Sequence, residues 1–454
     1  MISKDATGMS DRQVGLVIDK LGFVRKYKIL LIAASVGYLF DAFDNAILGY
    51  ALPAISQEFD ISPVVKGLII SAAQWGGLVG QLVWGPVTEA MGRLFAFRGT
   101  LLTFSLLTGL TVLAWNPVII GLSRFLAGTG LGAFVPVVTG VVSEMSPTKY
   151  RGRFTSFTTL LWPFGSLAGA FLSLMLLPVI GWRGMFLLGS VVIILAIFAP
   201  RLLPESPRWL AAKGRGDDAL KALRQLGATD QMIEEARSLP SEPAVQIDRK
   251  AAVSELFSPR WIRSIVLGGG LWITLNFAYL AVLLWLPSIL VDVYHLTMAR
   301  SLTYTVITAL VGLLGRVLGV YLIEVIGRKP LLYYTYACAA ASCLAFGNVS
   351  DPSYLLVFAA LFFFFTDQAS VCVIAYVPEL FPTRIRLVGA TWAAAAGRFT
   401  SALAPIMAGA LMAAGQYKTI WVVFAVMYVL GIVLIWTLGP ETKGRSLEQL
   451  YGER

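Results

Sequence analysis

The stretch EAMGR, from Glu89 to Arg93, occurs a second time 235 residues later as EVIGR, from Glu324 to Arg328. Two further motifs repeat at almost the same distance. The pattern ExxPTKxR at 144–151 returns as ExxPTRxR at 379–386, and PES at 204–206 returns as PET at 440–442. Three motifs with one spacing are hard to obtain by chance. They indicate a chain made of two duplicated halves.

The sequence on either side of these motifs is strongly apolar. The chain has 454 residues, of which 57% are hydrophobic, and its mean hydropathy is +0.75. This composition excludes an ordinary soluble protein. A membrane-spanning helix needs about 20 mostly apolar residues, and such stretches recur along the chain. We predict an all-α membrane protein with twelve spans, near residues 28–53, 65–86, 97–116, 118–142, 154–179, 183–201, 262–289, 299–323, 330–347, 353–376, 388–413 and 418–438.

The distribution of basic residues predicts the orientation of these spans. With the N-terminus in the cytoplasm, few of the 36 Lys and Arg residues fall in outer loops, namely Lys66, Arg183, Arg300 and Lys418. Cytoplasmic loops of membrane proteins collect basic residues, so both termini are predicted to be cytoplasmic. The net charge of +10 then needs no nucleic-acid partner. The predicted parts are a tail (1–27), a six-helix bundle (28–203), a polar linker with helical segments (204–260), a second six-helix bundle (261–439) and a tail (440–454).

The chain offers no pattern for enzyme chemistry or for metal binding. Its three cysteines lie in apolar stretches, and His295 is its one histidine. Neither a disulfide framework nor a metal motif is indicated, and no nucleophile and base recur together. We therefore predict no metal and no cofactor. Repeated membrane halves instead place a binding site near the midplane between them.

The repeated motifs resemble those of the major facilitator superfamily, and the resemblance covers essentially the whole chain. The family loop after span two reads GxxxDRxGRR, which this chain matches at Gly85, Glu89, Gly92 and Arg93 but not at two basic positions. The span-four pattern RxxxGxGxG appears at Arg124, Gly128, Gly130 and Gly132. These glycines lie within an apolar span, so we expect them to allow close helix packing rather than to bind a nucleotide.

A second resemblance narrows the branch of the superfamily. Asp41-Ala-Phe-Asp44 in span one is similar to the DGxD signature of aromatic acid:proton symporters, with Ala in place of Gly. The PESPR and PETKG stretches at 204 and 440 look like those of sugar porters and related metabolite:proton carriers. The paired glutamines that sugar porters have in span seven are missing, and so is the span-five pattern of the antiporters. The resemblance implies a monomeric secondary transporter in a bacterial inner membrane.

Six ionisable residues lie at predicted membrane depth: Asp41, Asp44, Arg124, Arg316, Asp367 and Arg398. Each costs at least ~2.5 kcal/mol to insert, which makes it a functional candidate. Asp41 and Asp44 are three residues apart and share a face of span one. We expect them to carry the coupling proton: an aspartate that alternates between a setting close to Arg124 and a buried one can take up a proton outside and release it inside. The alternative is a static ion pair that locks spans one and four together.

Arginine at the midplane suits an anionic substrate. Its guanidinium keeps its charge and presents a planar fork that fits a carboxylate, so Arg398 and Arg316 are predicted to bind substrate. The alternatives are that Asp367 already pairs with Arg398, or that Arg316 is the true partner of Asp367. The polar candidates for the same cavity are Asn276, Tyr279 and Gln74. The alternative for each is packing or a hydrogen bond that joins neighbouring helices. Aromatic candidates for stacking on a ring are Trp75, Trp162, Phe164 and Trp392.

The charged loop motifs are predicted to form a cytoplasmic gate. Acids and bases at fixed spacing beside helix ends suit inter-helix salt bridges that break when the carrier opens. The predicted gate residues are Glu89, Arg93, Glu144, Arg151, Glu324, Arg328, Glu379 and Arg386. Pairs four residues apart on one helix are weak at surfaces, so partners on neighbouring helices are expected. The alternative is that these residues only anchor the protein by the positive-inside rule.

The function that fits these features best is proton-coupled import of a small organic anion across the lipid bilayer. An aromatic carboxylate such as a hydroxybenzoate is the leading substrate, and the proton would offset its negative charge. A nicotinate-like acid, an aliphatic acid or a sugar is the alternative within the same fold. A sensor that uses the transporter fold without transport is a third interpretation. It is disfavoured because no sizeable soluble domain is appended.

Overall fold

The computed structural model describes residues 9–21, 25–239, 249–382 and 384–444, and in these ranges it contains helices and no strand. The outer parts of both predicted tails, part of the linker and position 383 of the repeated motif lie outside the described residues. The N-terminal half contains α2 (Arg25–Phe59), α3 (Pro63–Met91), α4 (Arg93–Leu110), α5 (Pro117–Met145), α6 (Thr148–Gly189) and α7 (Ile193–Leu202). The C-terminal half contains α12 (Ile262–Asp292), α13 (Met298–Val325), α14 (Arg328–Asn348), α15 (Pro352–Glu379), α16 (Arg386–Ala413) and α17 (Tyr417–Leu438).

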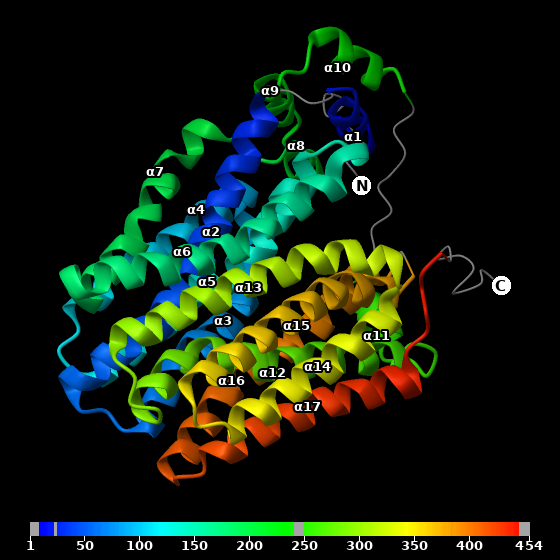
Figure 1. Cartoon of the computed structure of the whole chain (residues 1–454). Helices are drawn as coiled ribbons and strands as arrows, with labels where there is room; N and C mark the ends of the chain where they lie inside the picture. Colours follow the sequence, from blue (N-terminus) through cyan, green and yellow to red (C-terminus); the bar gives the residue numbers. More distant parts are fainter. Residues whose placement is uncertain (1–8, 22–24, 240–248, 383, 445–454) are drawn as a thin grey trace.

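Short helices decorate one end of the bundle. They are α1 (Asp11–Lys20), α8 (Pro207–Ala212), α9 (Gly216–Leu226), α10 (Asp230–Arg237) and α11 (Arg249–Leu256). The first four gather beside the N-terminal half, whereas α11 packs on α16 of the other half (Figure 1). We call this the linker end and the opposite end the outer end, which is the predicted extracellular side. The helix α1 lies inside the predicted N-terminal tail and extends the sequence-based prediction.

The duplication is visible in where the helices begin. Helices α3, α4 and α5 start 235 residues before α13, α14 and α15. Both α5 and α15 begin with a proline after a capping side chain, from Asn116 and Asp351 respectively. Gly92 and Gly327 separate helices at φ values of +108° and +95°, a conformation that favours glycine over residues with a side chain. The glycine of the repeated EAMGR and EVIGR motifs is therefore required by the backbone.

Every predicted span lies for most of its length on helices of the described chain. Eight stretches of the described residues are long and apolar enough to cross a membrane, judged by length and composition. One of them, 148–202, covers predicted spans five and six. These two spans are separated by a kink at Gly181, whose φ of +64° interrupts the long helix α6. Many large apolar side chains on the outward faces are exposed, including Leu82, Val179 and Trp436, as expected for a surface that meets lipid.

The two halves pack with matching pairs of helices. In the N-terminal half α2 packs on α6 and α3 on α5, and in the C-terminal half α12 packs on α16 and α13 on α15. Glycines bring α3 and α5 into contact, as the sequence predicts: a Cβ added to Gly132 would lie 2.2 Å from Cα of Gly77. Between the halves, α3 meets α16, α2 meets α12 and α6 meets α13. These three seams enclose the centre of the molecule, where the predicted site residues lie.

Candidate transport site

Asp44 and Arg124 form a fully enclosed ion pair inside the N-terminal half. Both side chains are 0% exposed, and Arg124 Nη2 contacts Asp44 Oδ2 while Nη1 donates to Oδ1 at 3.2 Å. The hydroxyl of Thr108 in α4 also donates to Asp44 Oδ1, at 2.7 Å. The pair therefore links α2, α4 and α5. A change at Asp44 would leave Arg124 buried without its carboxylate, which is costly.

Asp41 lies one helical turn before Asp44 and is placed differently. It is buried, and within the described chain no Lys or Arg nitrogen lies within 4.0 Å of its carboxylate. The charged groups that act on it are Arg398 and Asp44, and Trp162 is its hydrogen-bonding neighbour. The two aspartates of the DAFD motif thus share a face of α2 but have different partners. One is held by arginine within its own half, and the other faces a cation of the opposite half.

Arg398 reaches from α16 into the N-terminal half. Its Nη1 donates to the carbonyl of Gly132 at 3.1 Å, and the amide of Gln81 donates to the same oxygen at 3.1 Å. Among the described residues, no carboxylate lies within 4.0 Å of Arg398. The guanidinium is consequently held at the seam between the halves by one neutral acceptor. Its remaining donors have no ionic partner within 4.0 Å in the part of the chain that the structure describes.

Arg316 and Asp367 pair within the C-terminal half. Arg316 Nε and Nη2 donate to Asp367 Oδ1 at 3.0 and 2.9 Å, and Nη2 also donates to Ser370 Oγ at 2.9 Å. Asp367 therefore pairs with Arg316 and not with Arg398. The duplication explains the geometry, because Arg316 and Asp367 lie 235 residues after Gln81 and Gly132, which are also joined by a hydrogen bond.

A small cavity lies between the halves, beside Asp367. Its wall contains four aromatic side chains, and the polar side chains in it belong to Ser166, Thr305, Thr308 and Asp367. The aromatic residues are Tyr50, Trp162, Tyr279 and Phe363. The ring of Tyr279 lies 6.3 Å from that of Trp162 and 5.9 Å from that of Phe363, measured between centroids. Trp162 also neighbours Asp41, so this ring lies between the cavity and that aspartate.

The remaining predicted cavity residues are divided by the structure. Gln74 donates to Asn45 at 3.4 Å, and Asn276 lies against Gly397, next to Arg398. Trp75 packs on Phe399 across the seam, with ring centroids 5.5 Å apart. Phe164 and Trp392 are 41% and 47% exposed and do not line the cavity. Sequence reasoning missed Tyr50, Ser166, Thr308 and Phe363, because nothing in an apolar span marks which face turns inward.

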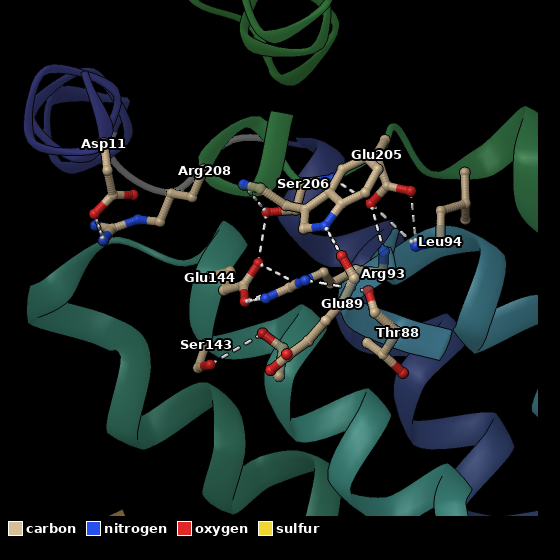
Figure 2. Close-up of polar contacts among 12 residues, drawn as sticks. Asp11, Thr88, Glu89, Arg93, Leu94, Ser143, Glu144, Glu205, Ser206 and Arg208 are labelled. Carbon is tan, nitrogen blue, oxygen red and sulfur yellow. Dashed lines mark hydrogen bonds and ion pairs between the residues drawn. The ribbon is translucent and has the colours of Figure 1, made fainter. Parts of the chain in front are cut away.

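Two of the predicted gate residues of the N-terminal half, Arg93 and Glu144, form a network with the PES motif at the linker end, and Glu89 joins it through its main chain (Figure 2). Arg93 Nε donates to Glu144 Oε1 at 2.9 Å, across α4 and α5. The backbone N–H of Arg93 donates to Glu205 at 2.8 Å, and Ser206 Oγ donates to Glu144 at 2.7 Å. The indole of Trp209 donates to the carbonyl of Glu89 at 2.9 Å. The PES motif therefore binds the helix ends of its own half.

The C-terminal half repeats three contacts of this network. Arg328 Nη2 donates to Glu379 Oε1 at 3.1 Å, Thr442 Oγ1 donates to Glu379 Oε2 at 2.5 Å, and the N–H of Arg328 donates to Glu441 at 3.2 Å. Glu324 also lies 3.4 Å from Arg328. Both arginines thus bond to an acid on a neighbouring helix. Arg386 donates to the nearby Phe381 carbonyl, and Arg151 has a buried Nε without a hydrogen-bond partner.

The two glutamates that cap these networks differ in their titration. Burial raises the pKa of Glu205, against the opposing effect of the N–H groups of Ser206, Leu94 and Arg93. For Glu441 burial also acts to raise the value, but backbone N–H groups outweigh it and lower the pKa. Both glutamates belong to the repeated PES and PET motifs, but the motifs do not reveal this role, in which a carboxylate accepts N–H bonds at a helix start.

The family of the chain follows from comparison with known proteins. Residues 22–451 match the family described as "Sugar (and other) transporter". The chain belongs to this family of the major facilitator superfamily. It is 30% identical to the niacin transporter NiaP of Acinetobacter baylyi, over 95% of this chain and 98% of the relative. It is also 30% identical to a gallate transporter of Pseudomonas putida, over 85% of this chain and 86% of the relative.

Solved structures show the same fold. The inward-open xylose transporter XylE from E. coli superimposes with a TM-score of 0.76 at 20% identity, covering 93% of this chain and 99% of that one. The prediction of a major facilitator fold is confirmed. This transporter is a multi-pass protein of the bacterial inner membrane and not an enzyme, as the sequence predicts.

Proposed function

We propose that this transporter imports a small aromatic carboxylate together with a proton, by alternating access. The observation that carries the proposal is the position of Arg398. It lies at the seam of the halves, where no carboxylate of the described residues is within 4.0 Å of it. A small cavity walled by aromatic rings lies between the same halves, and one of its rings, Trp162, neighbours Asp41. A planar guanidinium binds a carboxylate through two parallel hydrogen bonds, and aromatic walls suit a ring. A sugar carries no anionic group and so would not neutralise the charge of Arg398.

The relatives support an aromatic acid. Niacin, gallate and benzoate are the compounds named in three relatives at 26–30% identity, and each is a planar ring that carries a carboxylate. A hydroxybenzoate is our leading substrate. A nicotinate-like acid is the second candidate, because the niacin transporter matches 95% of this chain. Both compounds present the same carboxylate to Arg398. Selectivity between them therefore depends on how their different rings contact the residues of the cavity wall.

We propose Asp41 and Asp44 as the proton site. Protonation of Asp44 would remove the charge that holds Arg124, and so would loosen the junction of α2, α4 and α5. Asp41 faces Arg398, so a carboxylate substrate bound to Arg398 would compete with Asp41 for that cation. Binding of the anion would then favour protonation of the aspartates, because like charges disfavour each other's charged form. This coupling needs no cofactor other than the proton.

The proposal is tested by ligand binding to the purified carrier. Isothermal titration with 4-hydroxybenzoate, nicotinate, benzamide and xylose separates acid from neutral ligand and benzene from pyridine. We expect binding of at least one aromatic acid, with uptake of a proton that shows as a dependence of the binding heat on the buffer. Binding of xylose alone would contradict the proposal and favour a sugar. Asp367, which lines the cavity, and its ion partner Arg316 remain the second candidate contacts for the ligand.

A further inference from the structure

Two charged side chains meet across the seam between the halves, at the outer end. Lys66 lies in the first turns of α3 and Asp292 is the last residue of α12, with Lys66 Nζ 2.6 Å from Asp292 Oδ2. The side chain of Lys66 is 6% exposed and that of Asp292 is 31% exposed. Lys66 was counted in the sequence only as one of the few basic residues in outer loops. It is in fact buried between the two halves.

The surroundings of this pair form a tight seam. The hydroxyl of Ser71 donates to the carbonyl of Ala402, one helical turn further in. A Cβ added to Gly67 would lie 2.5 Å from the oxygen of Pro405, and one added to Gly409 would lie 2.5 Å from the oxygen of Pro63. The backbones of α3 and α16 are therefore in direct contact here. This end of the carrier is closed, and the packing of the halves shields the side chain of Lys66 from most contact with water.

Other ion pairs of the described chain differ from this one. The pairs Arg93–Glu144, Arg124–Asp44, Arg316–Asp367 and Arg328–Glu379 each stay within one half. At the outer end, Arg183 and Glu58 also belong to one half and are 40% and 39% exposed. Exposed pairs of that kind contribute little. A buried lysine is stable only with its partner, so the Lys66–Asp292 pair depends on the halves being together.

We propose that Lys66 and Asp292 are the outer gate of this transporter. The pair holds the outer ends of α3 and α12 together in the closed state and separates when the carrier opens outward, where water solvates both charges. Removal of Asp292 leaves a buried, unpaired ammonium in the seam and favours the outward-open state. Replacement of Lys66 by methionine removes the charge but still fills the seam, so its effect is smaller. The inference rests on the proposed alternating-access cycle, and it needs no particular substrate.

The test measures access to the seam from outside. Ser71→Cys places a thiol one turn below the pair, and a membrane-impermeant maleimide is added to right-side-out vesicles that carry the full-length protein. The protein without Ser71→Cys is labelled in parallel, and its labelling gives the background from the three native cysteines. Trp115→Cys, in an exposed loop at the same end, controls for reagent access. In the Ser71→Cys background, Asp292→Asn is expected to raise the labelling rate about tenfold or more, and Lys66→Met less.

Three further variants make the outcome decisive. Asp292→Glu keeps the charge and should label like the parent. The charge swap Lys66→Asp with Asp292→Lys should bring labelling back toward the parent rate. Glu58→Gln, at the exposed pair of the same end, should change nothing. An unchanged labelling rate in Asp292→Asn, or a rise in Asp292→Glu equal to that in Asp292→Asn, would overturn the gate. Labelling requires neither substrate nor proton, so a failure here is distinct from a failure of aromatic-acid transport.

Discussion

Replacement of Arg398 by lysine tests the contact on which substrate recognition depends. Nη1 of Arg398 donates to the carbonyl of Gly132. The edge of the guanidinium formed by Nε and Nη2 is therefore left to bind a carboxylate. A lysine has three donors on one nitrogen and cannot serve Gly132 and both carboxylate oxygens with good geometry. The expected loss is one charge-assisted hydrogen bond, about 1.5–3 kcal/mol. Affinity should therefore fall roughly ten- to a hundredfold.

The assay is isothermal titration of the purified protein with an aromatic acid and with its primary amide. The amide keeps the ring but has no charge, so its affinity should change by less than about threefold in Arg398→Lys. Arg300→Lys makes the same exchange at an exposed position in the first turn of α13 and serves as the matched control. If Arg398→Lys binds the acid as tightly as the wild type, the fork does not bind the carboxylate. If acid and amide weaken equally, the change has altered the cavity and not the ion contact.

Three other predictions concern coupling, packing and pH. Asp44→Asn should retain exchange of substrate across the membrane but lose accumulation driven by a pH gradient. The control Asp60→Asn, in an outer loop, should keep both activities. Accumulation by Asp44→Asn would exclude Asp44 as the essential proton site. Gly132→Ala should lower the free energy of unfolding by about 1–3 kcal/mol through overpacking, because its Cβ would lie 2.2 Å from Gly77 Cα. Gly140→Ala on the same helix is the control, since a Cβ there meets open space. Equal melting temperatures of the two variants would refute the prediction. The pKa of Glu205 is raised and that of Glu441 is lowered in the folded protein. Ionisation of Glu205 therefore costs stability as the pH rises above its unfolded pKa of about 4.3. The stabilisation by Glu441 is present above the same unfolded pKa and is lost as the pH falls through its lower folded pKa. Melting curves of Glu205→Gln and Glu441→Gln against pH should consequently diverge from the wild type in opposite directions, and parallel curves would contradict the assignment.

The duplication made most of the fold predictable from the sequence. The helix starts at Arg93 and Arg328 follow from glycines that need a positive φ, and the pairing of their side chains with Glu144 and Glu379 follows from motifs with a fixed spacing. Local chemistry determines these features, so they can be read from the sequence. The buried pair of Asp44 and Arg124 was predictable for a related reason, because each ion at membrane depth needs a partner.

The features that the sequence did not reveal depend on helix rotation and on contacts between halves. Depth along a span could not decide whether Asp367 meets Arg316 or Arg398, since the two arginines lie on different helices at similar heights. Trp162 and Trp392 look alike in sequence, yet one lines the cavity and the other is 47% exposed. In the sequence Lys66 is one of the cations of the predicted outer loops, whereas the packing of the two halves buries it beside Asp292 of α12. Such information resides in tertiary structure.

The central claim of this account is that the carrier couples an aromatic acid to the proton gradient. It is tested most directly by uptake of radiolabelled 4-hydroxybenzoate into proteoliposomes with an acidic exterior. With one proton per anion, a gradient of one pH unit can sustain up to about tenfold accumulation. We predict accumulation that collapses when a protonophore is added, and competition by nicotinate or other ring acids but not by xylose. Accumulation that survives the protonophore, or uptake of hexoses or pentoses with no uptake of any ring acid, would contradict the account.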